Sequence, residues 1–184
     1  MGSAAQDRAG VGFRWASAPG QVGAPERRRL LECWVEVSNA GGAVGFPRLP
    51  VDEARVGPVL DELLAGLGPH RSLLRALDGA ELLGWLALDV PDSEVTGHRG
   101  RVSRVQTALP ARGRGVGRAL MAEVARHARD DLGLDHLVLE VRGGAGTEPF
   151  YERLGWVRHG RHPRALRMPD GSLRDELHLH LPLR

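Results

Sequence analysis

The sequence predicts a single domain of the α/β class, and three observations support this fold class. Strand-like and helix-like runs follow one another along the chain, which is the pattern of helices packed against a sheet. A glycine- and arginine-rich stretch at residues 111–118 joins a strand-like run to an amphipathic helical run. With 184 residues and 42% hydrophobic content, the chain is long enough to bury one sizeable core.

The N-terminal half is predicted to contain a short strand, two helices and a pair of strands. Leu30, Trp34 and Val37 recur at helical spacing and give the first helix an apolar face. The second helix contains Gly57 and Pro58, and we expect an irregularity there because proline disrupts a helix interior. The predicted elements are a strand at 11–16, a helix at 26–39, a loop at 40–50, a helix at 52–67, and strands at 71–77 and 81–90.

The C-terminal half is predicted to alternate strands with helices and to end in a hairpin. Apolar residues between Val116 and Leu132 recur at i, i+3 and i+4, which indicates a helix. The strand before it stops at Pro110, and the last two strands are joined by a turn at residues 169–171. The predicted strands include residues 100–109, 137–142 and 174–181, with a short helix before Trp156.

Residues 111–118 are the most informative stretch of the chain. A strand, a glycine-rich turn and a helix start place several free backbone N–H groups around one point, at the positive end of the helix dipole. The glycines let the backbone approach an anion closely, and Arg112, Arg114 and Arg118 add positive charge. The stretch therefore predicts a site for the phosphate or pyrophosphate of a phosphorylated cofactor.

Two common phosphate-binding motifs are absent from this stretch. A P-loop requires a lysine, and the chain contains none. A dinucleotide-binding fingerprint requires a third glycine, but that position falls on Arg118 or Leu120. The acid that contacts the ribose in such folds ends the next strand, whereas Asp135 starts it. The loop therefore fits neither class of nucleotide site.

Two motifs resemble those of a known family. Arg112-x-x-Gly115-x-Gly117 resembles the acetyl-CoA signature, R/Q-x-x-G-x-G/A, of GNAT superfamily acetyltransferases. Downstream, the segment FYERLGW at residues 150–156 is similar to the fYe-x-lGf segment that closes the core of the same superfamily. The strand predicted between the two motifs lies where that fold requires one. The resemblance is strong over about residues 81–181 and weaker before them.

The resemblance implies a mixed, mostly antiparallel central sheet of six to seven strands flanked by about four helices. Residues 1–24 are expected to form an N-terminal extension, partly disordered and including the short first strand, and residues 25–184 a single GNAT acetyltransferase domain. The implied activity is acetyl-CoA-dependent N-acetylation, in which the acetyl group moves directly from the thioester to a primary amine of a small molecule. The alternative is a non-catalytic acyl-CoA-binding or regulatory module that has kept the fold.

The resemblance also implies which residues contact acetyl-CoA. The strand before the loop is expected to splay from its neighbour, so that its backbone binds the pantetheine arm and supplies a hydrogen-bond donor to the oxyanion. The alternative for its residues is an ordinary place in a ladder. The predicted acetyl-CoA-binding residues are Val105, Gln106, Thr107, Arg112, Gly113, Arg114, Gly115, Val116, Gly117 and Arg118.

Acyl transfer to an amine benefits from an acid for the leaving thiolate and requires loss of the amine proton. Tyr151, the only tyrosine of the chain, lies where the superfamily commonly places a tyrosine beside the sulfur, and it is the predicted acid. A core aromatic beside Phe150 is the alternative role for Tyr151. Glu140 is the predicted base, with an ion pair to a neighbouring arginine as the alternative. Glu94 and His98 are weaker candidates, and deprotonation through water requires no side chain at all.

The acceptor pocket is expected between the two N-terminal helices, the loop at 91–97 and the hairpin at 160–173. The arginines of that hairpin, which hint at an anionic group on the acceptor, are Arg161, Arg164 and Arg167. The superfamily often has an asparagine between the strand and the short helix, but residues 143–147 contain none. Pantetheine contacts there are therefore expected from the backbone, and Thr147 is expected to cap the helix.

Composition narrows the function and the setting of the protein. The net charge of +2 argues against a dedicated nucleic-acid binder, although residues 95–122 hold six arginines and no acid. No apolar run reaches the roughly 18 residues that cross a membrane. The single Cys33 cannot form an internal disulfide, which is typical of a cytoplasmic protein. All basic residues are arginine and isoleucine is absent, which indicates a GC-rich, bacterial genome.

Two pairs of histidines, His159 with His162 and His178 with His180, invite a metal-binding interpretation. No cysteine and no tight acidic cluster accompanies them, so exposed or strand-pairing roles are expected and no metal is predicted. The expected partners are acetyl-CoA and a small-molecule amine, with no nucleic acid and no membrane. A homodimer is a candidate assembly.

Overall fold

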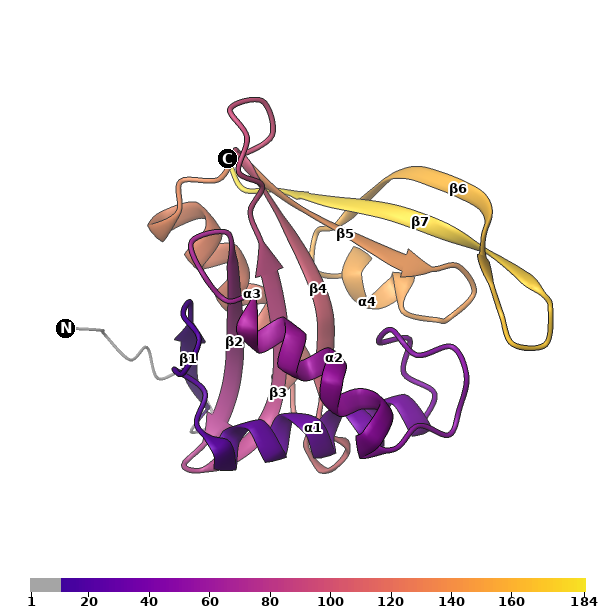
Figure 1. Cartoon of the computed structure of the whole chain (residues 1–184). Coiled ribbons are helices and arrows are strands. Elements are labelled where there is room, and N and C mark those ends of the chain that lie inside the picture. Colours follow the sequence, from indigo (N-terminus) through magenta and orange to yellow (C-terminus); the bar gives the residue numbers. More distant parts are fainter. Residues whose placement is uncertain (1–10) are drawn as a thin grey trace.

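The central feature of the structure, a computed structural model that describes residues 11–184, is a seven-stranded sheet in the order β1-β2-β3-β4-β5-β7-β6 (Figure 1). Five of its neighbouring pairs are antiparallel, and only β4 and β5 run parallel. The predicted α/β class and the mixed, mostly antiparallel sheet are therefore confirmed. The strands are β1 (Gly12–Ala16), β2 (Arg71–Asp78), β3 (Glu81–Asp89), β4 (Arg99–Thr107), β5 (His136–Arg142), β6 (Val157–Arg167) and β7 (Leu173–Pro182).

Four α-helices flank the sheet, as predicted. The second helix, α2, runs as one element through Pro58, so the expected interruption at Gly57 and Pro58 is absent from it. The helix predicted to extend to Leu132 leaves α-helical geometry earlier, in one turn of π-helix, η2. The helices are α1 (Ala24–Asn39), α2 (Glu53–Ala65), α3 (Val116–Arg126) and α4 (Glu148–Glu152), with the short turns η1 (Leu109–Ala111) and η2 (His127–Asp131).

The sheet separates two apolar clusters, and this gives the fold its three layers. Leu73 and Trp85 lie under α1 and α2, which cover one face of the N-terminal strands (Figure 1). Leu74 and Leu86, their neighbours along the chain, belong to the cluster that packs against α3 on the other face. Alternation of side chains along β2 and β3 therefore supplies both clusters, because successive residues of a strand point to opposite faces.

The first strand forms one edge of this sheet. Residues Gly12 to Ala16 of β1 pair antiparallel with β2, so the sheet already begins within the segment expected as an N-terminal extension. Residues 1–10 of the extension that was predicted to be partly disordered lie outside the described residues. No helix among the described residues has the length and apolar character needed to cross a membrane.

Strands β4 and β5 pair over only three residues and then diverge. Their parallel ladder joins Arg99, Gly100 and Arg101 to the segment 136–138. Beyond this point β4 stays paired with β3 up to Thr107, while β5 pairs with β7 over its whole length. The two halves of the sheet therefore separate into a wedge, visible in Figure 1 as the angle between β4 and β5. The splay that the family resemblance implied is present.

The first helix is fixed to the sheet by a buried ion pair. Arg75 on β2 is only 4% exposed at its side chain, and its Nη1 donates to Glu26 Oε2 at 2.7 Å. Burial lowers the pKa of Arg75, while the Glu26 carboxylate opposes that shift. Glu26 lies in the first turn of α1, where the helix dipole also favours a negative charge.

Replacing this carboxylate should be costly. We expect Glu26→Gln to lower the free energy of unfolding by about 2–3 kcal/mol, because it leaves a buried guanidinium without its counter-charge. Asp61→Asn is the matched control, since the Arg27–Asp61 pair is exposed and should contribute less than about 1 kcal/mol. Denaturant unfolding of the two variants measures both values, and equal losses would contradict the assignment.

Candidate active site

The wedge between β4 and β5 opens into a cavity of about 720 Å³. Its walls come from β4, from the loop and first turn of α3, from β5, and from α4 with the residues around it. The cavity is large enough for a cofactor of ordinary size. All but one of the predicted acetyl-CoA-binding residues line it: Val105, Gln106, Thr107, Arg112, Gly113, Gly115, Val116, Gly117 and Arg118.

One end of this cavity is formed by unpaired backbone donors. Within residues 11–184, no hydrogen bond is formed by the backbone N–H groups of Gly113, Gly115, Val116, Gly117 and Arg118. In the same stretch the N–H of Arg114 donates to the carbonyl oxygen of Ala111, and the next backbone bond is donated by Ala119 to the carbonyl oxygen of Gly115. These donors lie at the N-terminus of α3, where the helix dipole is positive, so the loop suits a phosphate or pyrophosphate group.

The glycines of the loop shape this donor cluster. Gly113 and Gly115 have φ values of +77° and +81°, a region that favours glycine, and a Cβ on either would enter open space. At Gly117 a Cβ would lie 3.4 Å from Phe150 and 3.5 Å from Thr107, so the helix start packs closely against both. Arg114 is the one predicted binding residue outside the lining, and its guanidinium lies 3.9 Å from Asp78.

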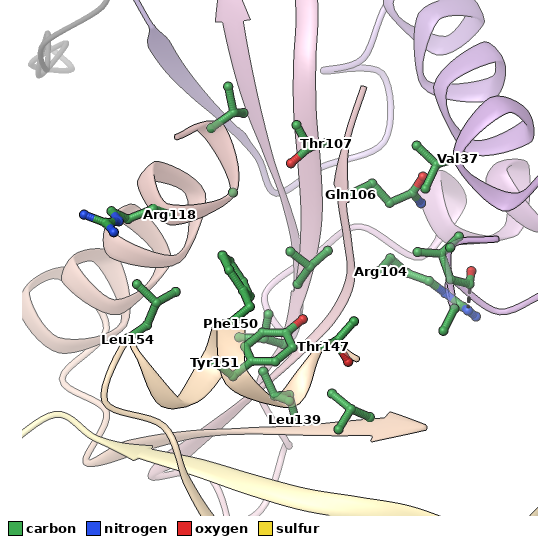
Figure 2. Close-up of a pocket in the computed structure, with 18 of the residues that line it drawn as sticks. Val37, Arg104, Gln106, Thr107, Arg118, Leu139, Thr147, Phe150, Tyr151 and Leu154 are labelled. Atoms are coloured by element: carbon green, nitrogen blue, oxygen red, sulfur yellow. Dashed lines mark hydrogen bonds between the residues drawn. The ribbon is translucent and has the colours of Figure 1, made fainter. Parts of the chain in front are cut away.

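The edge of β4 forms the long wall of the cavity. The parallel ladder with β5 ends at Arg101, so from there onward the strand has no β5 partner on the wedge side. Gln106 is 1% exposed, and its side-chain amide has no hydrogen-bond partner within the described residues. Figure 2 shows this amide pointing toward Val37 of α1. A buried amide without a hydrogen-bond partner costs free energy, so a polar group of a ligand beside Gln106 would stabilise this part of the wall.

Tyr151 projects from α4 into the same cavity (Figure 2). It is 9% exposed, and its ring lies 5.0 Å from Phe150 and 6.0 Å from Trp156 between centroids. Burial raises the pKa of Tyr151 to about 12. The residue therefore takes the alternative role of a core aromatic and at the same time presents a protonated phenol to the cavity.

The raised pKa gives a direct measurement, because Tyr151 is the only tyrosine. We expect the phenolate absorbance of the folded protein to rise near about pH 12, above the ordinary value of about 10 for tyrosine. Since the folded-state pKa is the higher one, the phenol contributes stability that is present below about pH 10 and lost between there and about pH 12. Phenolate appearing near pH ~10 with unchanged circular dichroism would contradict this burial.

A second cavity of about 650 Å³ lies on the other side of the wedge. Its walls include residues 43–47 and, among the elements that the sequence analysis expected around an acceptor, α1, α2 and residues 165–168 at the end of β6. The loop at 91–97 does not line it, which corrects that part of the prediction. This loop precedes β4 at the end where the strand meets β5, whereas the cavity forms where the two strands diverge. The residues common to both cavities are Ala43, Val44, Val102, Ser103, Arg104, Glu140, Val141 and Arg142.

Comparison with known proteins identifies this arrangement. The model of the acetyltransferase (GNAT) family matches residues 27–156, well over half of the chain. The chain belongs to the GNAT acetyltransferase family. The fold is similar to that of a GNAT family protein from Desulfovibrio desulfuricans, at 22% identity and a TM-score of 0.69, over 95% of this chain and 99% of the other.

Two further solved structures share the GNAT fold. The ribosomal-protein-alanine N-acetyltransferase from Brucella melitensis is 20% identical with a TM-score of 0.69, over 92% of this chain and 98% of the other. The protein yncA from Salmonella typhimurium, solved with its cofactor acetyl-CoA, is 16% identical with a TM-score of 0.69, over 95% and 94%. At these identities the likeness concerns the fold.

The candidate bases of this GNAT protein lie in different places. Glu140 lines both cavities, and Arg101 Nε donates to its Oε2 at 2.9 Å, so the ion pair named as its alternative role is present. Glu94 is exposed in the loop that precedes β4, and His98 is exposed with its ring against His136. Neither of them lines the two cavities described above, so Glu140 is the candidate base at their junction.

Residues 143–147, which lack the asparagine that is frequent in the GNAT superfamily, contribute Gly146 and Thr147 to the lining of the first cavity. The Thr147 side chain makes no capping bond, contrary to expectation; its carbonyl oxygen accepts instead from the backbone N–H of Phe150. Cys33 is buried, and burial raises its pKa to about 12, so its thiol is packed in the core and is not activated as a nucleophile. Among the described residues, no group of three or more His, Cys, Asp or Glu side chains has the arrangement of a metal site.

Sequence reasoning missed two residues at the centre of this GNAT site, Arg104 and Arg142. Arg104 lies in a bulge of β4, where it and Val105 face the single β3 residue Leu86. Its φ is +56°, which is uncommon for a residue other than glycine. Sequence patterns rarely signal such a bulge. The one available signal, for Arg104 alone, was the run of arginines without acids at residues 95–122.

Proposed function

We propose that the protein is an acetyl-CoA-dependent N-acetyltransferase that moves the acetyl group directly to a primary amine of a small molecule. The observation that carries this proposal is the junction of the two cavities, where β4 and β5 diverge. A cofactor-sized cavity with a cluster of backbone donors lies on one side, and a separate cavity with ionic walls lies on the other. An amine entering the second cavity can therefore reach a group held in the first.

Different residues of the first cavity are proposed to bind different parts of acetyl-CoA. Acetyl-CoA supplies, when bound, an activated acyl group on a thiol leaving group. The unpaired N–H groups of Gly113 and of residues 115–118 bind its pyrophosphate, helped by the positive end of the α3 dipole. The free edge of β4 from Val105 to Thr107 follows the pantetheine arm and donates a backbone N–H to the developing oxyanion.

Two side chains move protons in the proposed reaction. Glu140 accepts the proton that the amine loses as the new C–N bond forms. Tyr151 donates its phenolic proton to the sulfur as the C–S bond breaks, and its raised pKa keeps the phenol protonated at neutral pH. The products are the N-acetylated amine and the free thiol, and no covalent enzyme intermediate is required.

The role of Glu140 is tested by removing its charge. We expect Glu140→Gln to lower kcat by about 10²-fold, which is the lower end of the range for general base catalysis. Arg101→Gln is the control, because it breaks the same ion pair but leaves the carboxylate in place. A Glu140→Gln rate close to that of the wild type would show that water, and not this residue, removes the amine proton.

The proposal as a whole is tested by binding and then by turnover. Calorimetric titration with acetyl-CoA should show saturable binding, and mass spectrometry should then show an acetylated product from a broad panel of primary amines. Binding without turnover across the panel would favour a non-catalytic acyl-CoA-binding module. No binding by the folded protein would reject the acetyltransferase assignment.

A further inference from the structure

The second cavity contains more positive charge than its own acids neutralise. Arg71 is paired with Asp89 and Arg101 with Glu140, so these four charges cancel in pairs. Three further arginines line the cavity, and none forms an ion pair within residues 11–184: Arg104, Arg142 and Arg167. The two remaining acids of the lining are Glu62 and Glu176. The unpaired arginines therefore exceed the unpaired carboxylates, and some of the guanidinium donors are available to a ligand.

Arg104 is the most constrained of these arginines. Its left-handed backbone at the β4 bulge directs the side chain toward the segment after α1 (Figure 2), where Nη1 donates to the carbonyl oxygen of Val44 at 3.1 Å. The guanidinium lies 5.3 Å from the centroid of the Trp34 ring. These contacts hold the plane of the guanidinium. The hydrogen bond to Val44 uses only one of its five N–H donors, and the others have the fork geometry that suits a carboxylate.

The surroundings of Arg104 oppose its charge. Burial lowers its pKa, as do the nearby charges of Arg101 and Arg71, while Asp89 acts in the opposite direction. A guanidinium remains protonated in proteins, so the cost of holding it there remains in the free protein. A small anion in the cavity would supply the missing counter-charge, and the strain of the φ +56° backbone fits a residue held for function.

The other two arginines, Arg142 and Arg167, also line the second cavity. The sequence analysis had suggested three arginines of the hairpin as a site for an anionic group, and the structure distinguishes among them. Arg167 lines the cavity, but Arg161 is occupied by Asp175 at 2.6 Å, and the exposed Arg164 lies outside the lining. Arg142, at the end of β5, lines both cavities. The anion-binding group is therefore built from β4, β5 and one residue of β6, next to Glu140.

Apolar side chains complete the cavity. Trp34, Phe46, Val59 and Leu63 line it from α1, α2 and the segment between them. An acceptor that fills the cavity therefore meets an apolar wall, a positive group and the carboxylate of Glu140. We propose that the acceptor amine is an amino acid or a close analogue, whose carboxylate is bound by Arg104, Arg142 and Arg167 while its amine lies beside Glu140. This substrate class rests on the proposed function, because it assigns the second cavity to the acceptor.

The test compares two ligands that differ only in charge. N-acetyl-L-leucine and N-acetyl-L-leucinamide have the same shape, and only the first carries a carboxylate. Calorimetric titration of each into the protein saturated with CoA should show that the wild type binds the acid about tenfold or more tightly than the amide. Because this readout requires no turnover, it is independent of whether the protein catalyses acetyl transfer.

Three variants locate the anion-binding group. Arg104→Gln and Arg167→Gln should each reduce the preference for the acid by about tenfold, while Arg164→Gln, whose side chain lies outside the cavity, should leave it unchanged. Arg167 is exposed, so its variant tests the proposal even if Arg104→Gln destabilises the fold. Equal binding of acid and amide by the wild type, or an unchanged preference for the acid in Arg167→Gln, would overturn the proposal. Acid preference without turnover would instead reject only the transferase activity.

Discussion

The double variant Gly115→Glu, Gly117→Glu should lose acetyl-CoA binding, with Kd raised by about 100-fold or more, equivalent to about 2.7 kcal/mol. Both glycines belong to the donor cluster at the N-terminus of α3, and two carboxylates there would meet the pyrophosphate with like charge. Each new side chain has room in the free protein, because Gly115 faces open space and Gly117 has contacts no closer than 3.4 Å. Calorimetry with acetyl-CoA measures the loss.

A side chain at Gly115 would strain the backbone, and a control variant must separate this effect from the loss of binding. Gly171, in the β6–β7 turn, has the same φ of +81° and also faces open space, so Gly171→Glu imposes a comparable backbone cost away from the loop. Its thermal stability should fall as that of Gly115→Glu falls, while its affinity for acetyl-CoA stays at the wild-type value. Retained affinity in the double variant would show that the loop does not bind the pyrophosphate.

Tyr151→Phe should lower kcat by about 10²–10³-fold with little change in acetyl-CoA affinity. The substitution removes only the hydroxyl, and the ring keeps its contacts with Phe150 and Trp156, so the fold should be preserved. Because the pKa of the phenol is raised to about 12, the wild-type rate should not fall at alkaline pH through loss of this proton until about that value. Single-turnover kinetics measure the effect on the chemical step.

The role of Tyr151 as an acid makes a second measurement possible. An acetyl thioester whose thiol has a lower pKa needs less protonation as it leaves, so it should recover much of the rate lost in Tyr151→Phe. A purely structural role would give the same loss with both thioesters. Unchanged kcat in the variant would remove Tyr151 from the chemistry and leave it as a core aromatic.

Most elements of the fold could be predicted because local patterns decide them. The apolar spacing in α1 and the alternation in β5 match the elements closely. The interruption predicted from Pro58 is absent, because burial of the α2 side chains Val56 and Leu60 outweighs the free-energy cost of a proline inside the helix. The π-helical turn η2 could not be predicted, since the apolar residues on both sides of it keep helical spacing.

The cofactor half of the site was more predictable than the acceptor half. The loop from Arg112 to Arg118 is contiguous in sequence, and its glycines and arginines indicate an anion-binding site. The second cavity instead collects single residues from distant elements, and only the tertiary structure brings them together. Arg104 shows the difficulty, because its direction depends on a bulge set by the register against β3.

The short junction between β4 and β5 has a mechanical consequence. Three residue pairs join the two halves of the sheet, while each half keeps a longer ladder of its own. A small rotation of one half against the other would break no hydrogen bond within either half, yet it would change the width of both cavities together. The angle between β4 and β5 is thus one geometric variable that the two cavities share, because residues of both strands line both of them.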